Sequence, residues 1–187
     1  MPQTDRDTVE IRSLEESDAL AFRGLWLNAL REQPHAFSLT YDEAVDQRLP
    51  DFYRRFRSEW IAGDSVILGA FEAHRLVGAV GLRRWTREKQ QHKAYIWMCY
   101  VEPAFRRRGV GRRLLAAAIE RAHRMAGLDQ IQLSVSTESQ EARALYRSCG
   151  FEPFGYEHQA LKSGGEFVDL ELMVLHICAP PRPFEDC

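Results

Sequence analysis

The sequence lacks three features that would place it in a specialised class of protein. Its four cysteines (Cys99, Cys149, Cys178 and Cys187) are scattered, with no C-x-x-C pair and no histidines at a matching spacing. They therefore offer neither a disulfide framework nor a zinc site, and we predict no metal. No stretch approaches the roughly 18 apolar residues of a membrane-spanning helix. The N-terminus MPQTDRDTVE is polar and does not read as a signal peptide, so we expect a cytoplasmic protein without a membrane partner.

A large net charge is also missing, because the formal charge is only −2. The charges are nevertheless unevenly placed. Between Arg83 and Arg124, twelve Lys or Arg residues face three Glu residues, so this window carries +9 and the rest of the chain −11. A basic segment in an acidic chain fits either a local anionic ligand or a solvated basic face, and charge alone does not separate these two. It argues less for a nucleic-acid coat, so we predict no nucleic-acid partner.

Length and composition favour one ordinary compact domain. The chain has 187 residues, of which 45% are hydrophobic and 28% charged. We assign residues 1–177 to this domain. The last ten residues, 178–187, contain three prolines, and we predict that they form a mobile tail outside the fold.

The hydrophobic period changes along the chain between that of helices and that of strands. Together the segments predict an α/β (α+β) fold, in which one mixed sheet of about six to seven strands is flanked by about four helices. The run 94–101 is almost wholly apolar, as in a central strand covered on both faces. Strands are expected at 8–13, 65–72, 76–84, 94–101, 130–136, 154–161 and 167–177, and helices from 17 to Pro34, over 43–59, over 110–126 and from 137 to 149.

Particular residues mark the expected helix ends. Ser17 is a candidate N-cap for the first helix. Thr137 and Gln140 have the spacing of a capping box for the last one. Gly127 and Gly150 stand where helix-ending glycines belong. Pro50 indicates either a bend within the second helix or the start of a separate piece.

One loop has the composition of an anion-binding site. Arg106-x-x-Gly109-x-Gly111 lies between the apolar run 94–101 and an amphipathic helix. The first turn of a helix offers unpaired N–H groups and partial positive charge, and glycines let phosphates approach the main chain. The loop lacks the Lys-Ser/Thr of a P-loop and the third glycine of a dinucleotide fingerprint. Alternatively, it is a helix N-terminus with ordinary glycine flexibility.

A second group of residues follows in the next helix: Ala142-x-x-Leu145-Tyr146-x-x-x-Gly150-Phe151. Taken alone, Tyr146 fits a packed amphipathic aromatic better than a catalyst. Together with Val101-Glu-Pro103 and Arg106-x-x-Gly109-x-Gly111, however, this segment resembles the two signatures of the GCN5-related N-acetyltransferase (GNAT) superfamily. The resemblance implies a single GNAT-like domain that uses acetyl-CoA as cosubstrate.

The resemblance also implies roles for individual residues. Tyr146 would be the general acid that protonates the departing thiolate. Ser139 replaces the asparagine that commonly contacts the coenzyme. The strand before the loop would carry a bulge that opens the sheet, and its last main-chain groups would bind the pantetheine arm. The coenzyme-binding residues implied in this way are Cys99, Tyr100, Val101, Arg106, Arg107, Arg108, Gly109, Val110, Gly111, Arg112, Ser139 and Tyr146.

The general base has no clear candidate. Some family members carry a glutamate at positions matching Tyr95 or Trp97, and neither residue is a carboxylate. Asp169 and Glu171 are alternatives, although both fit surface or substrate-contact carboxylates better. Cys99, in its apolar run, reads as a small core residue rather than a reactive thiol.

The family's acceptor pocket would lie near residues 37–57, the hairpin loop and 156–167. Aromatic and acidic residues in and beside these segments would suit a small cationic amine, although most also fit packing or surface roles. We expect transfer of an acetyl group to a primary amine on a small-molecule or amino-acid-like acceptor. Acetylation of a protein Lys or N-terminus and a non-catalytic acyl-CoA sensor are the alternatives. A homodimer through the C-terminal strands is possible in this family. The acceptor candidates are His35, Tyr41, Asp42, Tyr53, Tyr156, Glu157 and His158.

Overall fold

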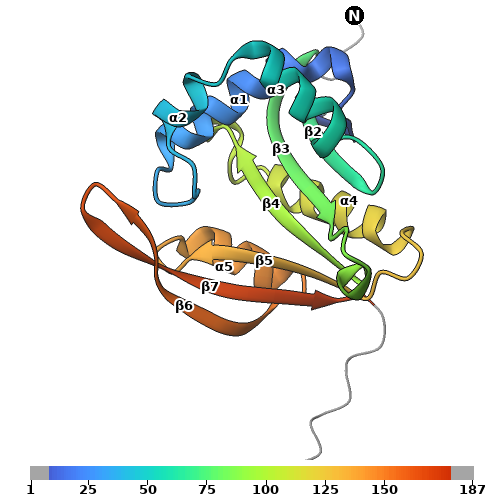
Figure 1. The fold of residues 1–187 in the computed structure, drawn as a ribbon, viewed down its shortest axis with the longest axis vertical. Helices are drawn as coiled ribbons and strands as arrows, with labels where there is room; N and C mark the ends of the chain where they lie inside the picture. Colours follow the sequence, from blue (N-terminus) through green and yellow to red (C-terminus); the bar gives the residue numbers. More distant parts are fainter. Residues whose placement is uncertain (1–8, 178–187) are drawn as a thin grey trace, which may run out of the picture.

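A computed structural model describes residues 9–177, which form a seven-stranded mixed sheet (Figure 1). The strand order is β1-β2-β3-β4-β5-β7-β6. The expected tail 178–187, with Cys178 and Cys187, lies outside the described residues, as does Thr8. The elements are β1 (Val9–Ser13), α1 (Ala19–Glu32), α2 (Tyr41–Val45), α3 (Leu49–Arg55), β2 (Ser65–Glu72), β3 (Arg75–Arg84), β4 (Lys93–Val101), α4 (Val110–His123), β5 (Gln130–Ser136), α5 (Gln140–Ser148), β6 (Glu152–Ser163) and β7 (Glu166–His176).

The sheet consists of two antiparallel parts. Strands β1 to β4 pair antiparallel in chain order, and β5, β7 and β6 form the second antiparallel group. A parallel pairing between β4 and β5, with α4 in the crossover, joins the two parts. One buried cluster lies between the sheet and α4, and the other lies between the sheet and α1 to α3. The expected mixed α/β fold is confirmed.

Elements with a strong local period lie where the sequence places them, although some of the helices differ by a few residues at their ends. The strands at 65–72 and 130–136 match β2 and β5 residue for residue. Helix α4 ends at His123 rather than Ala126, and Gly127 occupies a left-handed turn beyond it with φ +71°. Gly150 likewise follows α5 with φ +91°.

The segment 43–59 is not one continuous helix, and the alternative that Pro50 stands near the start of a separate piece is confirmed. The structure divides this segment into α2, α3 and a π-helical turn, Phe56–Trp60. Pro50 lies in the first turn of α3, where its missing N–H costs no helical hydrogen bond. The described residues therefore contain five α-helices instead of about four.

Two expected caps do not form. Ser17 lies inside a short 3-10 turn, Glu16–Asp18, and the reciprocal cap joins Glu15 to Asp18, with Glu15 N donating to Asp18 Oδ2 at 2.8 Å. At α5 the N-cap position belongs to Ser139, not Thr137, and the Ser139 side chain makes no capping hydrogen bond. A capping motif read from spacing alone does not fix the residue at which the helix begins.

Candidate active site

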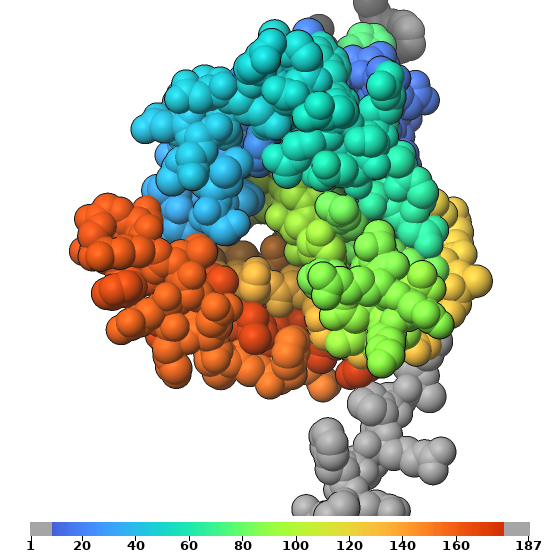
Figure 2. All heavy atoms as spheres, in the orientation of Figure 1, coloured from blue at the N-terminus to red at the C-terminus, as the bar shows by residue number. Residues whose placement is uncertain are grey.

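Strands β4 and β5 pair over a short stretch only, and a cavity lies where they separate. Only Lys93–Tyr95 pair with Gln130–Gln132, and beyond them the two strands separate. The space between the strands belongs to a cavity of about 1260 Å³, which the end of β4 and the first turns of α4 and α5 help to line. Figure 2 shows an opening on one face, bordered by light-blue residues near 40, the lime-green β3–β4 segment and the orange β6–β7 hairpin.

A β-bulge in β4 determines which of its side chains face each side of the sheet. Gly81 pairs with Met98 and Leu82 with Ile96, so Trp97 has no partner on β3. After the bulge, Met98 joins the core beneath α1, whereas Ile96 before it belongs to the core beneath α4. The expected bulge is present, but at Trp97 rather than at 99–101. As expected, β4 is covered on both faces, but its alternate residues are only half-buried because the strand also borders the cavity.

Gly81 makes room for the Trp97 indole. A Cβ atom at Gly81 would lie 2.3 Å from Trp97 Cε2 and 2.4 Å from Trp97 Nε1, distances that no packed side chain tolerates. The indole in turn stacks near Trp60, with ring centroids 5.2 Å apart. The sequence shows a glycine in a strand but not which ring crosses it, so reasoning from sequence missed this pair.

The loop after β4 shapes a cradle of main-chain amides. Gly109, the N-cap of α4, has φ +77°, and Arg107 also adopts a positive φ of +58°. Arg113 N donates the first helical hydrogen bond to Gly109 O at 3.1 Å, so the amides of Val110, Gly111 and Arg112 precede the helical ladder. We call residues 107–112 the amide cradle. Of these, Arg107, Gly109, Val110, Gly111 and Arg112 line the cavity.

The two glycines of the cradle have different surroundings. A Cβ on Gly109 would meet no protein atom within 4 Å and would extend into open space. A Cβ on Gly111 would lie 3.2 Å from Leu145 Cδ2 of α5. Gly109 therefore leaves the main chain open to a ligand, whereas Gly111 also lets α4 and α5 pack closely.

The arginines around the cradle do not all face it. Arg106 holds the loop, because its Nε donates to Val101 O at 2.8 Å and its guanidinium pairs with Glu32 at 3.0 Å. Arg112 is bound to the end of α5 through Ser148, at 2.9 Å to Oγ. The Arg108 side chain lies over the Phe105 ring, 5.2 Å from its centroid, and Arg108 is not among the residues lining the cavity.

This arrangement fits a diphosphate-bearing coenzyme. The open space above Gly109, the free helical amides and the lining residues Arg107 and Arg112 supply main-chain donors and positive charge in one place. Beyond Tyr95, the β5-facing edge of β4 has no strand partner among the described residues. Cys99, Tyr100 and Val101 lie on this part of β4 and line the cavity, so their main chain is open to an extended arm.

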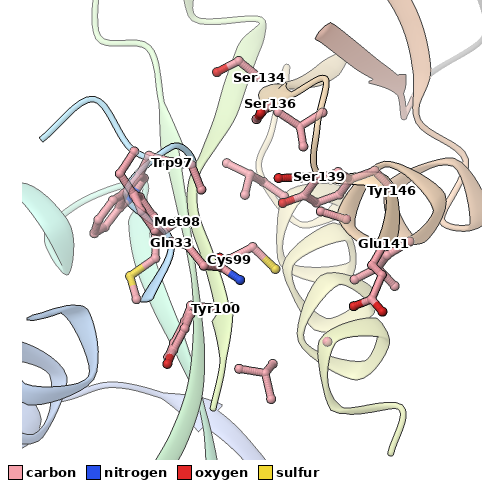
Figure 3. A pocket seen from close by; sticks show the side chains of 18 of the residues that line it. Gln33, Trp97, Met98, Cys99, Tyr100, Ser134, Ser136, Ser139, Glu141 and Tyr146 are labelled. Carbon is pink, nitrogen blue, oxygen red and sulfur yellow. The ribbon is translucent and has the colours of Figure 1, made fainter. Parts of the chain in front are cut away.

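Tyr146 lies across the opening from Cys99. Figure 3 shows the Cys99 sulfur directed from β4 towards α5, which carries Tyr146, with Ser139 beside it at the start of the helix. Burial, with a contribution from the neighbouring Cys99, raises the pKa of the Tyr146 phenol well above its ordinary value. Burial also raises the pKa of the Cys99 thiol to about 11, so this cysteine is not a ready nucleophile.

Glu171 is buried, so its interpretation as a surface or substrate-contact carboxylate is wrong. Its side chain has no exposed surface, and its oxygens accept hydrogen bonds from Arg143 Nε, Arg147 and Tyr156 Oη, each at 2.8 Å. The hydrogen bond from Arg143 is the main cause that lowers its pKa to about 2. Such a weak base, closed off by its partners, cannot accept the proton of an amine.

Asp169, the other candidate base, also has local partners. It accepts a hydrogen bond from Gln159 N at 2.7 Å and lies 3.0 Å from His158 Nδ1. These interactions, the first above all, lower the pKa of the carboxyl. Neither Asp169 nor Glu171 lines the cavity, although the adjacent Leu170 does.

The side of the cavity opposite the cradle is aromatic. We call Trp26, Phe37, Trp60, Tyr95 and Trp97 the aromatic wall. Arg55 and Arg83 also line this side, whereas the two acidic residues of the described lining, Glu138 and Glu141, belong to the start of α5. The seven acceptor candidates expected from the sequence are all absent from the lining. Arg83 lies opposite Tyr95 in the β3–β4 register, which the sequence does not show because it depends on the bulge at Trp97.

Residues 9–177 contain neither a membrane-spanning helix nor a cluster of metal-ligating side chains. No helix within residues 9–177 is long and apolar enough to cross a bilayer. In the same part of the chain, no three His, Cys, Asp or Glu side chains gather where they could hold a metal ion.

Comparison with known proteins agrees with the geometry. The model of the Acetyltransferase (GNAT) family matches residues 26–151. The chain is 32% identical over 110 residues to N-alpha-acetyltransferase RimI of Mycobacterium tuberculosis, a match covering 59% of this chain and 66% of that protein. The chain spans only part of the length of the curated relatives that it matches. The matched part covers 66% of RimI and 26% and 27% of two other relatives.

Solved structures share the whole fold. An acetyltransferase of the GNAT family from Streptococcus pneumoniae superposes with a TM-score of 0.80 at 26% identity, covering 91% of this chain and 100% of that one. The yncA protein of Salmonella typhimurium, solved with acetyl-CoA, gives a TM-score of 0.75 over 96% of this chain and 100% of its own. Its 20% identity to this chain supports the likeness of fold alone.

Proposed function

Since the chain belongs to the GNAT family of acetyltransferases, we propose that it transfers the acetyl group of acetyl-CoA to a primary amine on a small, amino-acid-like molecule. One observation carries this proposal. Tyr146 faces the end of β4 across the split sheet, in the same cavity as the amide cradle. A diphosphate held in the cradle and an arm along β4 would bring a thioester sulfur near the Tyr146 hydroxyl.

The proposed reaction is a direct acyl transfer. The amine nitrogen attacks the thioester carbonyl carbon, a C–N bond forms, and the C–S bond breaks with its electron pair passing to sulfur. Tyr146 donates its phenolic proton to that sulfur, and the nitrogen loses one proton to water, from which Tyr146 is reprotonated. Burial raises the pKa of Tyr146, and a thiol in the same surroundings, Cys99, is affected in the same direction. We therefore expect burial to raise the pKa of the departing thiol as well as that of the phenol.

Replacing Tyr146 tests this role. In an assay of free thiol release from acetyl-CoA with a panel of amines, Tyr146→Phe should lower kcat roughly 10²-fold while leaving coenzyme affinity nearly unchanged. Tyr53→Phe, a tyrosine outside the cavity lining, is the matched control. Unchanged turnover in the Tyr146 variant would remove Tyr146 from the mechanism.

We assign no side chain as the base. Tyr95 and Trp97 stand where some relatives carry a carboxylate, and Glu171 is engaged elsewhere. If water takes the proton, the pH at which kcat/KM rises should follow the pKa of the acceptor amine. If kcat/KM instead rises at the same pH for amines of different pKa, a protein side chain acts as the base.

A protein α-amine is the second candidate acceptor. It is favoured by the similarity to RimI, which is named as an N-alpha-acetyltransferase. Mass spectrometry of peptides incubated with acetyl-CoA separates the two, because a protein acetyltransferase would modify N-termini or lysines faster than free small amines. Tight acetyl-CoA binding without turnover on any amine would instead indicate a sensor.

Three further proposals concern the whole chain. We propose that residues 1–177 form one domain and that the protein is cytoplasmic. We also propose that it forms a homodimer through its C-terminal strands. The last is supported by β6, an edge strand whose Phe154 and Tyr156 are exposed. Sedimentation velocity of the full chain tests it, and a monomer at micromolar concentration would end that proposal.

A further inference from the structure

The aromatic side of the cavity carries an unbalanced positive charge. Arg55 of α3 and Arg83 of β3 both line it. Their shared acidic neighbour is Glu59, whose Oε2 lies 3.7 Å from Arg55 Nε and 3.9 Å from Arg83 Nη1. Glu59 itself is not among the lining residues. Two guanidinium groups and one carboxylate leave a net charge of +1 beside the cavity.

Both arginines retain hydrogen-bonding capacity. The distances to Glu59 exceed those of a hydrogen bond, and within residues 9–177 neither guanidinium donates one. Each guanidinium has five N–H donors in a planar fork that matches a carboxylate or another oxyanion. An anionic group entering here would therefore find donors that do not first have to leave other partners.

The aromatic wall fixes where these charges lie. The Arg55 guanidinium carbon is 4.8 Å from the centroid of the Trp60 ring, which is 5.2 Å from the centroid of Trp97 at the bulge. Arg83 pairs in register with Tyr95, the last β4 residue paired with β5. The arginines thus border one end of the aromatic wall, whereas Cys99 and Tyr146 mark the reacting end of the cavity.

We infer that the acceptor is zwitterionic: a primary amine joined to a carboxylate or similar oxyanion, which Arg55 and Arg83 bind. This inference rests on the proposed acetyl transfer and names its substrate class. The anionic end binds at the two arginines, the intervening carbons pack on the aromatic wall, and the amine points towards the thioester. It replaces the expected cationic acceptor, because acidic side chains are missing from the described lining of this side.

Matched acceptor pairs test the inference on the unaltered protein. Amino acids with the amine and carboxylate at different separations are compared with their uncharged amides by thiol release. At the separation that fits, kcat/KM for the acid should exceed that for the amide roughly 10- to 100-fold, the range of a charge-assisted hydrogen bond. Amides used as well as acids throughout the panel would overturn it.

Variants locate the effect. Arg55→Gln and Arg83→Gln should each lower kcat/KM for the acid roughly 10-fold or more and leave that for the amide nearly unchanged. Arg54→Gln is the control, since Arg54 pairs with Asp51 at 2.9 Å and lies outside the lining. Equal losses for acid and amide would contradict a binding role, and acetyl-CoA affinity reports whether each variant is folded.

The two proposals fail differently. If no amine of any class releases thiol although acetyl-CoA binds, the proposed acetyl transfer fails. If amines are acetylated without preference for the anionic members, only the zwitterionic acceptor fails.

Discussion

At the scale of single residues, Gly81 holds open the space that Trp97 fills. Gly81→Ala would force the indole away from β3, because the new methyl would lie 2.3 Å from Cε2. We expect a loss of about 1–3 kcal/mol in the free energy of unfolding. The acceptor KM should rise while the coenzyme Kd stays nearly constant, as kinetics and calorimetry measure.

Gly155→Ala is the matched control for this change. Gly155 also lies in a strand, but its added Cβ would meet Leu172 Cδ1 at an ordinary 3.6 Å. If both variants raise the acceptor KM equally, Trp97 does not shape the acceptor site.

Gly109 is constrained by its backbone, not by protein neighbours. With φ +77° and open space above it, Gly109→Ala should cost about 1–2 kcal/mol of backbone strain. It should also place a methyl group in the amide cradle, so the Kd for acetyl-CoA should rise in titration calorimetry. Gly63→Ala has the same strain at φ +60° and the same open surroundings, but lies outside the cavity. Equal coenzyme affinity in both variants would argue against the cradle.

At the scale of secondary-structure elements, Glu171 fastens α5 to the sheet. It stands on β7 and binds Arg143 and Arg147 of α5 and Tyr156 of β6. Glu171→Gln would leave these arginines without their anionic partner. We expect a loss of about 1–3 kcal/mol in unfolding free energy at neutral pH, measured by urea denaturation. Asp169→Asn, which removes a half-exposed ion pair on the same strand, should cost less.

The same carboxylate predicts how stability depends on pH. Its pKa is about 2 in the folded protein, against 4.5 as the ordinary value for the unfolded chain. Above about pH 4.5 it is ionised in both states and its stabilisation is complete. As the pH falls towards 2, the unfolded chain takes up the proton first, and roughly 3 kcal/mol is lost. Glu171→Gln should show a weaker decline between pH 5 and about 3; an identical decline would place the titrating group elsewhere.

Local sequence determines some of these elements and not others. Strands β2 and β5 follow from their own hydrophobic pattern, and the cradle follows from two glycines at a strand–helix junction. Pro50 marks the start of α3, but the contact of Trp60 with Trp97 joins distant segments and has no local signal. The burial of Glu171 likewise requires arginines from α5, and no local pattern shows that a carboxylate on a strand will meet them.

At the scale of the whole molecule, the parts of the cavity come from both halves of the split sheet. The aromatic wall comes from the first half, through α1, the loop after it, the π-helical turn Phe56–Trp60 and β4, whereas Tyr146 and Ser139 come from the second. The sequence places the coenzyme motifs, because they are local. The acceptor side depends on how the two halves meet, and its two arginines lie 28 positions apart in the sequence, at 55 and 83.

The short β4–β5 pairing links folding to ligand concentration. Within residues 9–177, three residue pairs make up the ladder between the sheet halves. A coenzyme bound in the gap between β4 and β5 would hydrogen-bond main-chain groups of β4 that otherwise face water, as a neighbouring strand would. At a hundred times its Kd it would add about 2.7 kcal/mol to the stability of the folded state. We expect the melting temperature to rise with acetyl-CoA concentration and hydrogen exchange to slow first at β4 residues 96–101; uniform slowing over the whole sheet would contradict a ligand held in this gap.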